Sequence, residues 1–197
     1  MRTGKTINFN ITIMKNILLI LFTLFFALGT SAQTKKTVNS SKKLVAYFSC
    51  TGNTKQAAQK IADAIGAELY EIKPAKAYVA ADLDYRNKKS RSTFEMQDPS
   101  SRPAVSGKIG NIKKYDIIYV GYPIWWNLAP RIINSFIEKN NFKGKKVALF
   151  ATSGSSTIDN SEKELKKSYK DINWQPGLLI KKNTDNNAII QWTNGIK

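Results

Sequence analysis

The 197-residue chain contains no histidine and a single cysteine, Cys50. Without histidine, histidine-based catalytic triads and the usual zinc sites are excluded. One cysteine permits neither an intramolecular disulfide nor a C-x-x-C redox pair. Acidic residues are also scarce, with 14 Asp and Glu against 31 Lys and Arg, which gives a formal net charge of +17.

The positive charge is spread along the chain and is not gathered in one motif. Lysine pairs recur along the chain, among them Lys88-Lys89, Lys113-Lys114, Lys145-Lys146, Lys166-Lys167 and Lys181-Lys182. Such scatter is typical of a solvated surface, and no aromatic residues interleave the pairs as a nucleic-acid groove requires. We therefore expect no nucleic-acid partner. A basic protein outside the cytoplasm would instead be steered to an acidic partner or an anionic membrane face.

The first 32 residues have the pattern of a secretory signal peptide. A basic stretch at residues 14–16 precedes an apolar run, residues 17–28, in which Thr23 is the one polar side chain. Small residues follow at positions 29–32, and the chain turns polar at Gln33. The pattern predicts cleavage after Ala32 and export to the periplasm or the extracellular space. The run is short for a membrane span, so we expect no stable span after cleavage; an uncleaved anchor is the alternative.

Composition divides the rest of the chain into a leader and one domain. Within the predicted signal peptide, residues 1–13 look like an upstream extension, and Met14 is an alternative start. Residues 33–42 form a polar, basic leader that we expect to be disordered. Residues 43–197 form one domain, long enough for a sizeable core. Cleavage would leave 28 basic against 14 acidic residues, a net charge near +14.

The domain is organised around a strand, a hydroxyl-rich loop and a helix. Residues 44–48 form a short apolar, aromatic-rich run, which predicts a strand buried on both faces. The loop Ser49-Cys50-Thr51-Gly52-Asn53-Thr54 follows, and apolar residues then recur at helical spacing from about Thr54. Unpaired N–H groups, the positive end of the helix dipole and the hydroxyls meet there, so we expect an anion site.

This loop lacks the common nucleotide-binding motifs. Neither G-x-x-x-x-G-K-[ST] nor G-x-G-x-x-G follows the strand, and a hydroxyl loop without lysine suits a phosphomonoester bound without a metal. The pattern Ser-x-Thr-Gly-Asn-Thr resembles the phosphate loop of the flavodoxins, which holds the phosphate of flavin mononucleotide (FMN). The resemblance implies that FMN is the cofactor and that its phosphate contacts Ser49, Thr51, Gly52, Asn53 and Thr54. The alternative is an ordinary helix cap made by the same residue types.

Cys50 lies within the same loop, beside a helix N-terminus that would lower the pKa of an accessible thiol. It occupies the variable position of the pattern, where any small residue would serve. We therefore assign Cys50 no chemical role.

Strand and helix patterns alternate to the end of the chain. Further strands are predicted at residues 68–72, 115–121 and 146–151 and, within 171–180, around residues 177–180. Further helices are predicted at 131–139, 160–169 and 183–197. Residues 75–111 show no clear period, which is typical of a functional loop or a lid, with short helices expected around 82–86 and 90–97. The segment resembles the insert of one flavodoxin-like branch at Asp84, Tyr85, Arg91, Glu95, Arg102 and Pro103. We expect these six residues to serve solvent-exposed packing.

Two adjacent tryptophans follow the third predicted strand, in the stretch Tyr122-Pro123-Ile124-Trp125-Trp126-Asn127. Neighbouring residues of a regular element point in different directions, so only one indole is easily buried. An exposed, rigid aromatic group at the carboxyl end of a parallel strand suits a flat ring ligand. The stretch resembles the same flavodoxin-like branch, which implies that Pro123, Trp125, Trp126 and Asn127 contact the isoalloxazine ring. The alternative is one tryptophan in the core and one at a partner surface.

A second hydroxyl-rich loop, Thr152-Ser153-Gly154-Ser155-Ser156-Thr157, follows the fourth predicted strand. Ser/Gly turns are common, so the loop by itself indicates little. It resembles the second flavin-contacting loop of the flavodoxins. The resemblance implies that Thr152, Ser153, Gly154 and Ser155 offer N–H and hydroxyl groups to the polar edge of the flavin.

The order of the predicted elements indicates an α/β fold, with a doubly wound five-stranded parallel sheet and helices on both faces. The flavodoxin-like strand order 2-1-3-4-5 places a ligand crevice outside the carboxyl ends of strands one and three. Three loops come after strands that end at that edge. They are the phosphate loop (residues 49–54), the tryptophan loop (residues 122–127) and the Ser/Gly loop (residues 152–157). We therefore expect the three loops to form one site.

The resemblance implies an FMN-binding, flavodoxin-like protein that transfers electrons to a redox partner protein. One alternative is an NAD(P)H-dependent flavin reductase of quinones or nitro compounds, with residues 75–111 as its lid. The other is a flavodoxin-like scaffold without flavin that binds another anionic ligand, because secretory export unfolds the chain and FMN would have to be acquired outside the cytoplasm. Flavodoxins are commonly acidic, so the basic surface favours an acidic partner here.

Overall fold

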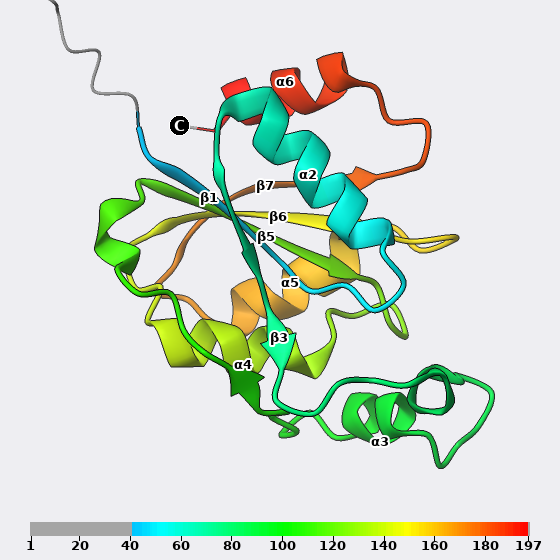
Figure 1. Ribbon diagram of the computed structural model, residues 1–197. Coiled ribbons are helices and arrows are strands. Elements are labelled where there is room, and N and C mark those ends of the chain that lie inside the picture. Colours follow the sequence, from blue (N-terminus) through cyan, green and yellow to red (C-terminus); the bar gives the residue numbers. More distant parts are fainter. Residues whose placement is uncertain (1–40, 197) are drawn as a thin grey trace, which may run out of the picture. The chain divides into compact units, whose positions relative to one another are not determined.

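The computed structural model describes residues 41–196, which are built on a five-stranded sheet (Figure 1). The strands are β1 (Lys43–Tyr47), β2 (Glu68–Glu71), β5 (Ile117–Pro123), β6 (Lys146–Thr152) and β7 (Asn173–Ile180). They lie in the order β2-β1-β5-β6-β7, and every neighbouring pair is parallel. Counted along the chain, this is the order 2-1-3-4-5. The predicted flavodoxin-like α/β fold is confirmed.

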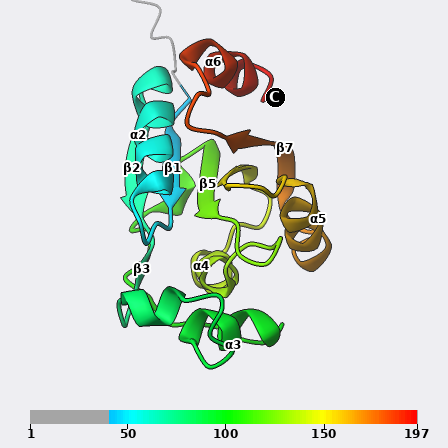
Figure 2. The ribbon, with the colours of Figure 1, turned by 90° about the vertical axis from the view of Figure 1, so that its right-hand side faces the viewer.

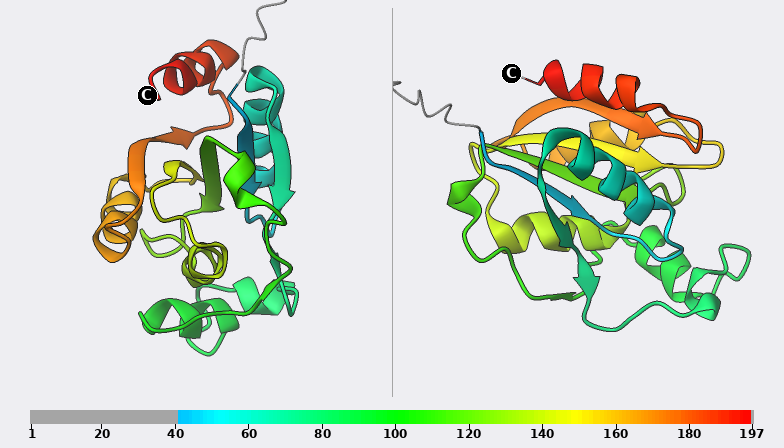
Figure 3. Two further views of the ribbon diagram at one scale, coloured as in Figure 1. Left: turned by 90° about the vertical axis from the view of Figure 1, so that its left-hand side faces the viewer. Right: turned by 45° about the horizontal axis from the view of Figure 1, so that its top comes forward.

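Helices cover both faces of the sheet (Figures 1 and 3). One apolar cluster includes residues of α2 (Asn53–Ile65) and α6 (Asn186–Asn194), and the other includes residues of α4 (Arg131–Asn140) and α5 (Asp159–Ser168). Successive residues of β1 contribute alternately to the two clusters, since side chains alternate across a strand. This two-sided burial explains why the central strands β1, β5 and β6 have nearly continuous apolar sequences.

The segment between β2 and β5 replaces one of the crossover helices. It contains β3 (Lys73–Pro74) and β4 (Val105–Ser106), which pair antiparallel, and the helical turns η1 (Ala80–Leu83) and η2 (Ile112–Lys114). Its one α-helix is α3 (Arg91–Gln97), which Ser90 caps by accepting a hydrogen bond from the Thr93 N–H. The short helix expected at 90–97 is present as α3, whereas the one expected at 82–86 is found earlier, as η1. We refer to residues 75–111 as the insert.

The predicted signal peptide at residues 1–32 and nearly all of the predicted leader at residues 33–42 lie outside the described residues. Between residues 41 and 196, no helix is both long and apolar enough to cross a membrane.

Candidate functional site

The predicted ligand edge lies where β1, β5 and β6 end, and these strands are neighbours in the sheet (Figure 2). Three hydrogen bonds join the ends of these strands and the segments that follow them. The Phe48 N–H donates to the Gly121 carbonyl at 2.9 Å, and the Ile124 N–H donates to the Thr152 carbonyl at 2.9 Å. The hydroxyl oxygens of Thr54 and Thr152 are 2.8 Å apart. The structure thus brings the phosphate, tryptophan and Ser/Gly loops together.

The phosphate loop ends at an uncapped helix. Gly52 occupies the N-cap position of α2 with φ 89°, a left-handed conformation that favours glycine. No side chain caps the helix, and its first turn contains no acidic residue. The first backbone N–H groups of a helix have no intrahelical partner and lie at the positive end of its dipole. The start of α2 therefore favours an anion.

The hydroxyls of this loop are arranged as donors. The Ser49 hydroxyl accepts from the Gly52 N–H at 3.2 Å, and the Thr51 hydroxyl accepts from the Asn53 amide at 3.5 Å. Since a hydroxyl has one proton and two lone pairs, each keeps its own O–H to donate. Thr54 differs, because its side chain is buried and its hydroxyl is bonded to Thr152. Thr54 can therefore serve a phosphate through its backbone N–H.

The tryptophan loop is a tight turn after β5. The backbones of Trp125 and Leu128 exchange two hydrogen bonds, at 3.0 and 2.9 Å. The two residues between them, Trp126 and Asn127, have φ 47° and 61°. Positive φ at both central residues is the signature of a type I′ turn, which normally carries Asn or Gly. Asn127 suits this conformation, whereas a bulky residue such as Trp126 is strained in it.

The two indoles have different surroundings. Trp125 is half-buried and meets the rings of Phe48 and Tyr78 edge to face, with centroid distances of 5.6 and 5.5 Å. Trp126 is 46% exposed. One tryptophan thus packs against the core and the other faces solvent. Both nevertheless line the same pocket, so neither is turned away from the ligand edge.

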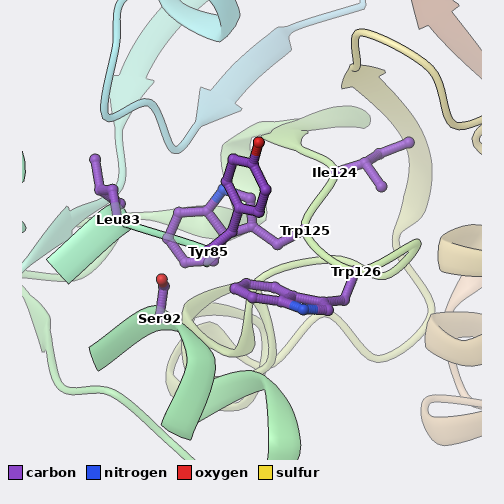
Figure 4. A pocket seen from close by; sticks show the side chains of 6 residues that line it. All are labelled: Leu83, Tyr85, Ser92, Ile124, Trp125 and Trp126. Carbon is purple, nitrogen blue, oxygen red and sulfur yellow. The ribbon is translucent and has the colours of Figure 1, made fainter. Parts of the chain in front are cut away.

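That pocket has a volume of about 350 Å³ and is shared between the tryptophan loop and the insert (Figure 4). Ile124 completes the side formed by the loop, and the insert contributes Leu83, Tyr85 and Ser92. Tyr85 is 72% exposed at the pocket. Sequence reasoning assigned no site role to these three insert residues. They lie between 33 and 43 residues before the tryptophans in the chain, and no local pattern predicts where an aperiodic segment folds back.

A buried ion pair anchors the insert beside Trp125. The Arg91 Nε donates to a Glu95 oxygen at 2.7 Å, and their side chains are only 20% and 12% exposed. The Tyr78 hydroxyl donates to the same carboxylate, and the Arg91 guanidinium lies 3.8 Å from the Tyr78 ring centroid. Burial, together with the hydrogen bond to Glu95, raises the pKa of Tyr78 well above its usual range. Arg91 and Glu95 are therefore internal anchors, and the expectation that they serve exposed packing is wrong.

Cys50 lies near this anchor. Burial raises the pKa of the Cys50 thiol from 9.0 to about 12, and the charge of Glu95 adds to the shift while that of Arg91 opposes it. The thiolate is the nucleophilic form of cysteine, and it is almost absent at neutral pH. This environment agrees with the prediction that Cys50 has no chemical role.

The Ser/Gly loop follows β6, directly beside the tryptophan loop. Pro123, the last residue of β5, pairs with Thr152 in the sheet. The Ser153 hydroxyl accepts from the N–H groups of Ser155 and Ser156, at 3.2 and 2.9 Å. Ser153 thereby holds the turn and keeps its own O–H to donate. Gly154 and Ser155 are exposed at its tip.

Comparison with known proteins decides the family. Residues 42–196 match the family model described as flavodoxin. The chain belongs to the flavodoxin family. It is 31% identical over 115 residues to the flavodoxin-like domain-containing protein BilS of Clostridioides difficile, a match that covers 58% of the chain and 48% of BilS. The chain thus spans about half the length of this curated relative.

Two solved structures that resemble this flavodoxin are described as flavoproteins. A candidate flavoprotein from Bacteroides eggerthii is 56% identical, with a TM-score of 0.77 over 79% of this chain and 98% of that one. A flavoprotein from Lactobacillus acidophilus, solved in complex with FMN, is 22% identical, with a TM-score of 0.64 over 78% of this chain and 99% of that one. The second likeness shows the shared fold.

FMN is the cofactor of the flavodoxin family, and the residues of this chain fit it. The uncapped start of α2, with free hydroxyl donors beside it, suits the phosphate. The pocket lined by Trp125 and Trp126 suits the flat ring. The Ser/Gly loop supplies further polar groups, and its Thr152 is hydrogen-bonded both to Thr54 at the start of α2 and to Ile124 at the pocket. Among residues 41–196 no cluster of His, Cys, Asp or Glu that could hold a metal is present.

Proposed function

We propose that this flavodoxin is an electron carrier that holds FMN and transfers electrons to a partner protein. The observation that carries the proposal is the size of the pocket at the tryptophan loop. Its volume of about 350 Å³ is near the lower end for small-molecule sites. A space of this size accommodates one planar ring system. Bound FMN supplies the redox chemistry, and the chain binds, orients and shields it.

The absorption spectrum of the purified protein tests cofactor binding. We expect the chain from residue 33 onward, purified or mixed with FMN, to show a flavin spectrum and to quench flavin fluorescence. Steady-state oxidation of NADPH in the presence of a quinone tests the carrier role. An electron carrier should show no saturable turnover above that of free FMN. A colourless protein that does not bind FMN would contradict both parts of the proposal.

The insert supports a second candidate, a flavin reductase that uses a nicotinamide cofactor. Leu83, Tyr85 and Ser92 line the pocket from the insert, as the residues of a lid would. Tyr85 is largely exposed and would have to move outward to admit a substrate. Saturable reduction of a quinone by NADPH, with a Michaelis constant for the quinone that changes in Tyr85→Ala while FMN still binds, would select this function over the carrier.

We further propose that the partner is acidic and that the protein works outside the cytoplasm. The export part rests on the signal-peptide pattern at residues 1–32. The partner part rests on the exposed cations Lys88 and Lys89, which lie in the insert between the pocket residues Tyr85 and Ser92. The acidic residues of the insert are engaged within it. Asp82 accepts from the Val79 N–H, and Asp84 and Glu95 pair with Arg86 and Arg91.

Reoxidation by small acceptors of opposite charge tests this electrostatic proposal. For each acceptor, the rate of reaction with the reduced protein is divided by its rate with free reduced flavin. This ratio should be higher for anionic ferricyanide than for cationic hexaamminecobalt, and added salt should reduce the difference. Lys88→Glu/Lys89→Glu should slow the ferricyanide reaction several-fold at low salt. Lys167→Glu/Lys170→Glu, at the far end of α5, is the matched control. Equal effects of the two double variants would contradict steering by the insert.

N-terminal sequencing of the protein secreted by its host tests export. The mature chain should begin at Gln33.

A further inference from the structure

The turn that carries Trp126 needs support from outside itself. Trp126 and Asn127 both have positive φ, and neither is glycine. Residues held in sparsely populated backbone regions persist where the surrounding structure holds them. The two hydrogen bonds between Trp125 and Leu128 close the turn but do not tie it to the rest of the domain.

That support comes from α5. The Asn160 side-chain amide donates to the Asn127 carbonyl at 3.1 Å, across 33 residues of sequence. The donor has to be the NH2 group, because the amide oxygen in the same place would face another carbonyl oxygen. Asn160 is the second residue of α5, so this hydrogen bond ties the turn to another element of the domain.

Asn160 is itself fixed relative to β5, the strand from which the turn emerges. The next residue, Ser161, is fully buried, and its hydroxyl lies 3.1 Å from the Tyr122 hydroxyl of β5. The same hydroxyl donates to the Ile158 carbonyl at 2.8 Å, which closes the start of the helix. The beginning of α5 is therefore anchored to the sheet, and Asn160 offers its amide from a rigid base.

This arrangement leaves one peptide of the turn available. The N–H of Leu128 and the carbonyl of Trp125 are used in closing the turn, and the Asn127 carbonyl is bonded to Asn160. Within residues 41–196, the Trp126 carbonyl and the Asn127 N–H take part in no hydrogen bond. They belong to the peptide next to the exposed indole that lines the pocket.

We propose that Asn160 is a positioning residue for the ring half of the cofactor site. By holding the Asn127 carbonyl, it fixes the turn in the conformation that presents the Trp126 indole and the free Trp126–Asn127 peptide to the pocket. The inference rests on the proposed binding of FMN. It assigns Asn160 no contact with the phosphate, which α2 and its loop serve.

Asn160→Ala tests the proposal, and Asn187→Ala is the matched control. Asn187 is likewise the second residue of a helix, α6, and is exposed. We expect the dissociation constants of FMN and of riboflavin to rise by the same factor in Asn160→Ala, about threefold to tenfold, which is the range for one hydrogen bond. Riboflavin shares the ring of FMN and lacks its phosphate, so an equal factor places the effect at the ring. Asn187→Ala should change neither constant.

A second measurement needs no flavin. The backbone order parameter of Asn127 in the flavin-free protein should fall from the rigid range near 0.85 toward 0.6 in Asn160→Ala and not in Asn187→Ala. If the wild type binds FMN, an unchanged order parameter or an unchanged riboflavin affinity in Asn160→Ala would overturn the positioning role. Failure of the wild type to bind FMN would instead overturn the proposed function.

Discussion

The hydroxyl groups of Thr54 and Thr152 meet at 2.8 Å, although 98 residues separate them in the chain. Thr54 lies in the first turn of α2, and Thr152 is the last residue of β6. The bond joins the phosphate loop to the Ser/Gly loop in a partly buried position. The two loops are therefore parts of one site whose geometry depends on this contact.

Replacing either threonine with valine should separate the two loops. Each variant keeps the branched shape and loses one hydroxyl, so the other hydroxyl is left without its partner. We expect Thr54→Val and Thr152→Val each to lower the free energy of unfolding by about 1 kcal/mol, and the double variant to lose less than the sum. Urea unfolding of the cycle measures this coupling. Strict additivity would show that the bond does not form in solution.

Thr193→Val is the control for this cycle. The Thr193 hydroxyl donates to the Ile190 carbonyl within α6, away from the site. It should leave FMN affinity unchanged, whereas the Thr54 and Thr152 variants should weaken it.

Gly52 should matter for the phosphate and not for the ring. An added Cβ would meet nothing within 4 Å, so the cost of Gly52→Ala comes from φ 89° alone, about 1 kcal/mol. We expect FMN affinity to fall while riboflavin affinity is unchanged. Gly144 has φ 71° and equally open surroundings at the opposite edge of the sheet. Gly144→Ala should cost similar stability without altering FMN binding. If both variants weaken FMN alike, the effect is global.

The two tryptophans should respond in opposite ways to truncation. Trp126→Ala should weaken FMN binding about threefold to tenfold, because an exposed stacking surface is lost, and should change stability by less than about 0.5 kcal/mol. Trp125→Ala should lower the free energy of unfolding by about 2 kcal/mol or more, because Trp125 packs on Phe48 and Tyr78. Flavin titration and urea unfolding of both variants measure the contrast. The reverse pattern would place Trp125 at the ring surface.

Cys50 should make stability fall at alkaline pH. Its thiol has a pKa of about 12 in the folded protein and 9.0 as the usual value, so above pH 9 the unfolded chain loses a proton that the folded chain keeps. The unfolded state then binds fewer protons, and the free energy of unfolding decreases as pH rises from about 9 toward 12. Urea unfolding between pH 8 and 10.5 should show a steeper decline for the wild type than for Cys50→Ala. Parallel declines would mean that the thiol is not shielded.

The basic surface should raise the potential of the bound flavin. Acidic side chains near the ring disfavour its anionic reduced form, and cations favour it. With a formal net charge of +17, or near +14 after the predicted cleavage, the chain should therefore give a less negative couple than acidic flavodoxins do. A redox titration of the FMN-loaded protein measures this. Lys88→Glu/Lys89→Glu should lower the potential. A wild-type potential as low as that of acidic flavodoxins would refute the argument.

The amino-acid sequence by itself determined the elements and the positions of the three loops. Strand patterns with both faces apolar, the helical period after Thr54 and the turn residues between them are local signals. The structure reproduces the five strands of the main sheet and its covering helices with differences at their ends, and adds β3, β4 and η2, which were not predicted. The placement of the loops at one edge also follows from the sequence, because parallel strands joined by helices all end at the same edge.

Only the tertiary structure decided which side chains complete the site. Trp125 and Trp126 are adjacent in sequence, yet a strained turn sends one against Tyr78 and leaves the other exposed. Tyr85 reaches the pocket from an aperiodic insert, and Asn160 reaches the turn from another helix. These contacts join residues that are far apart in the chain. A local pattern carries no information about such pairs, because packing and hydrogen bonding select them only once the whole domain has folded.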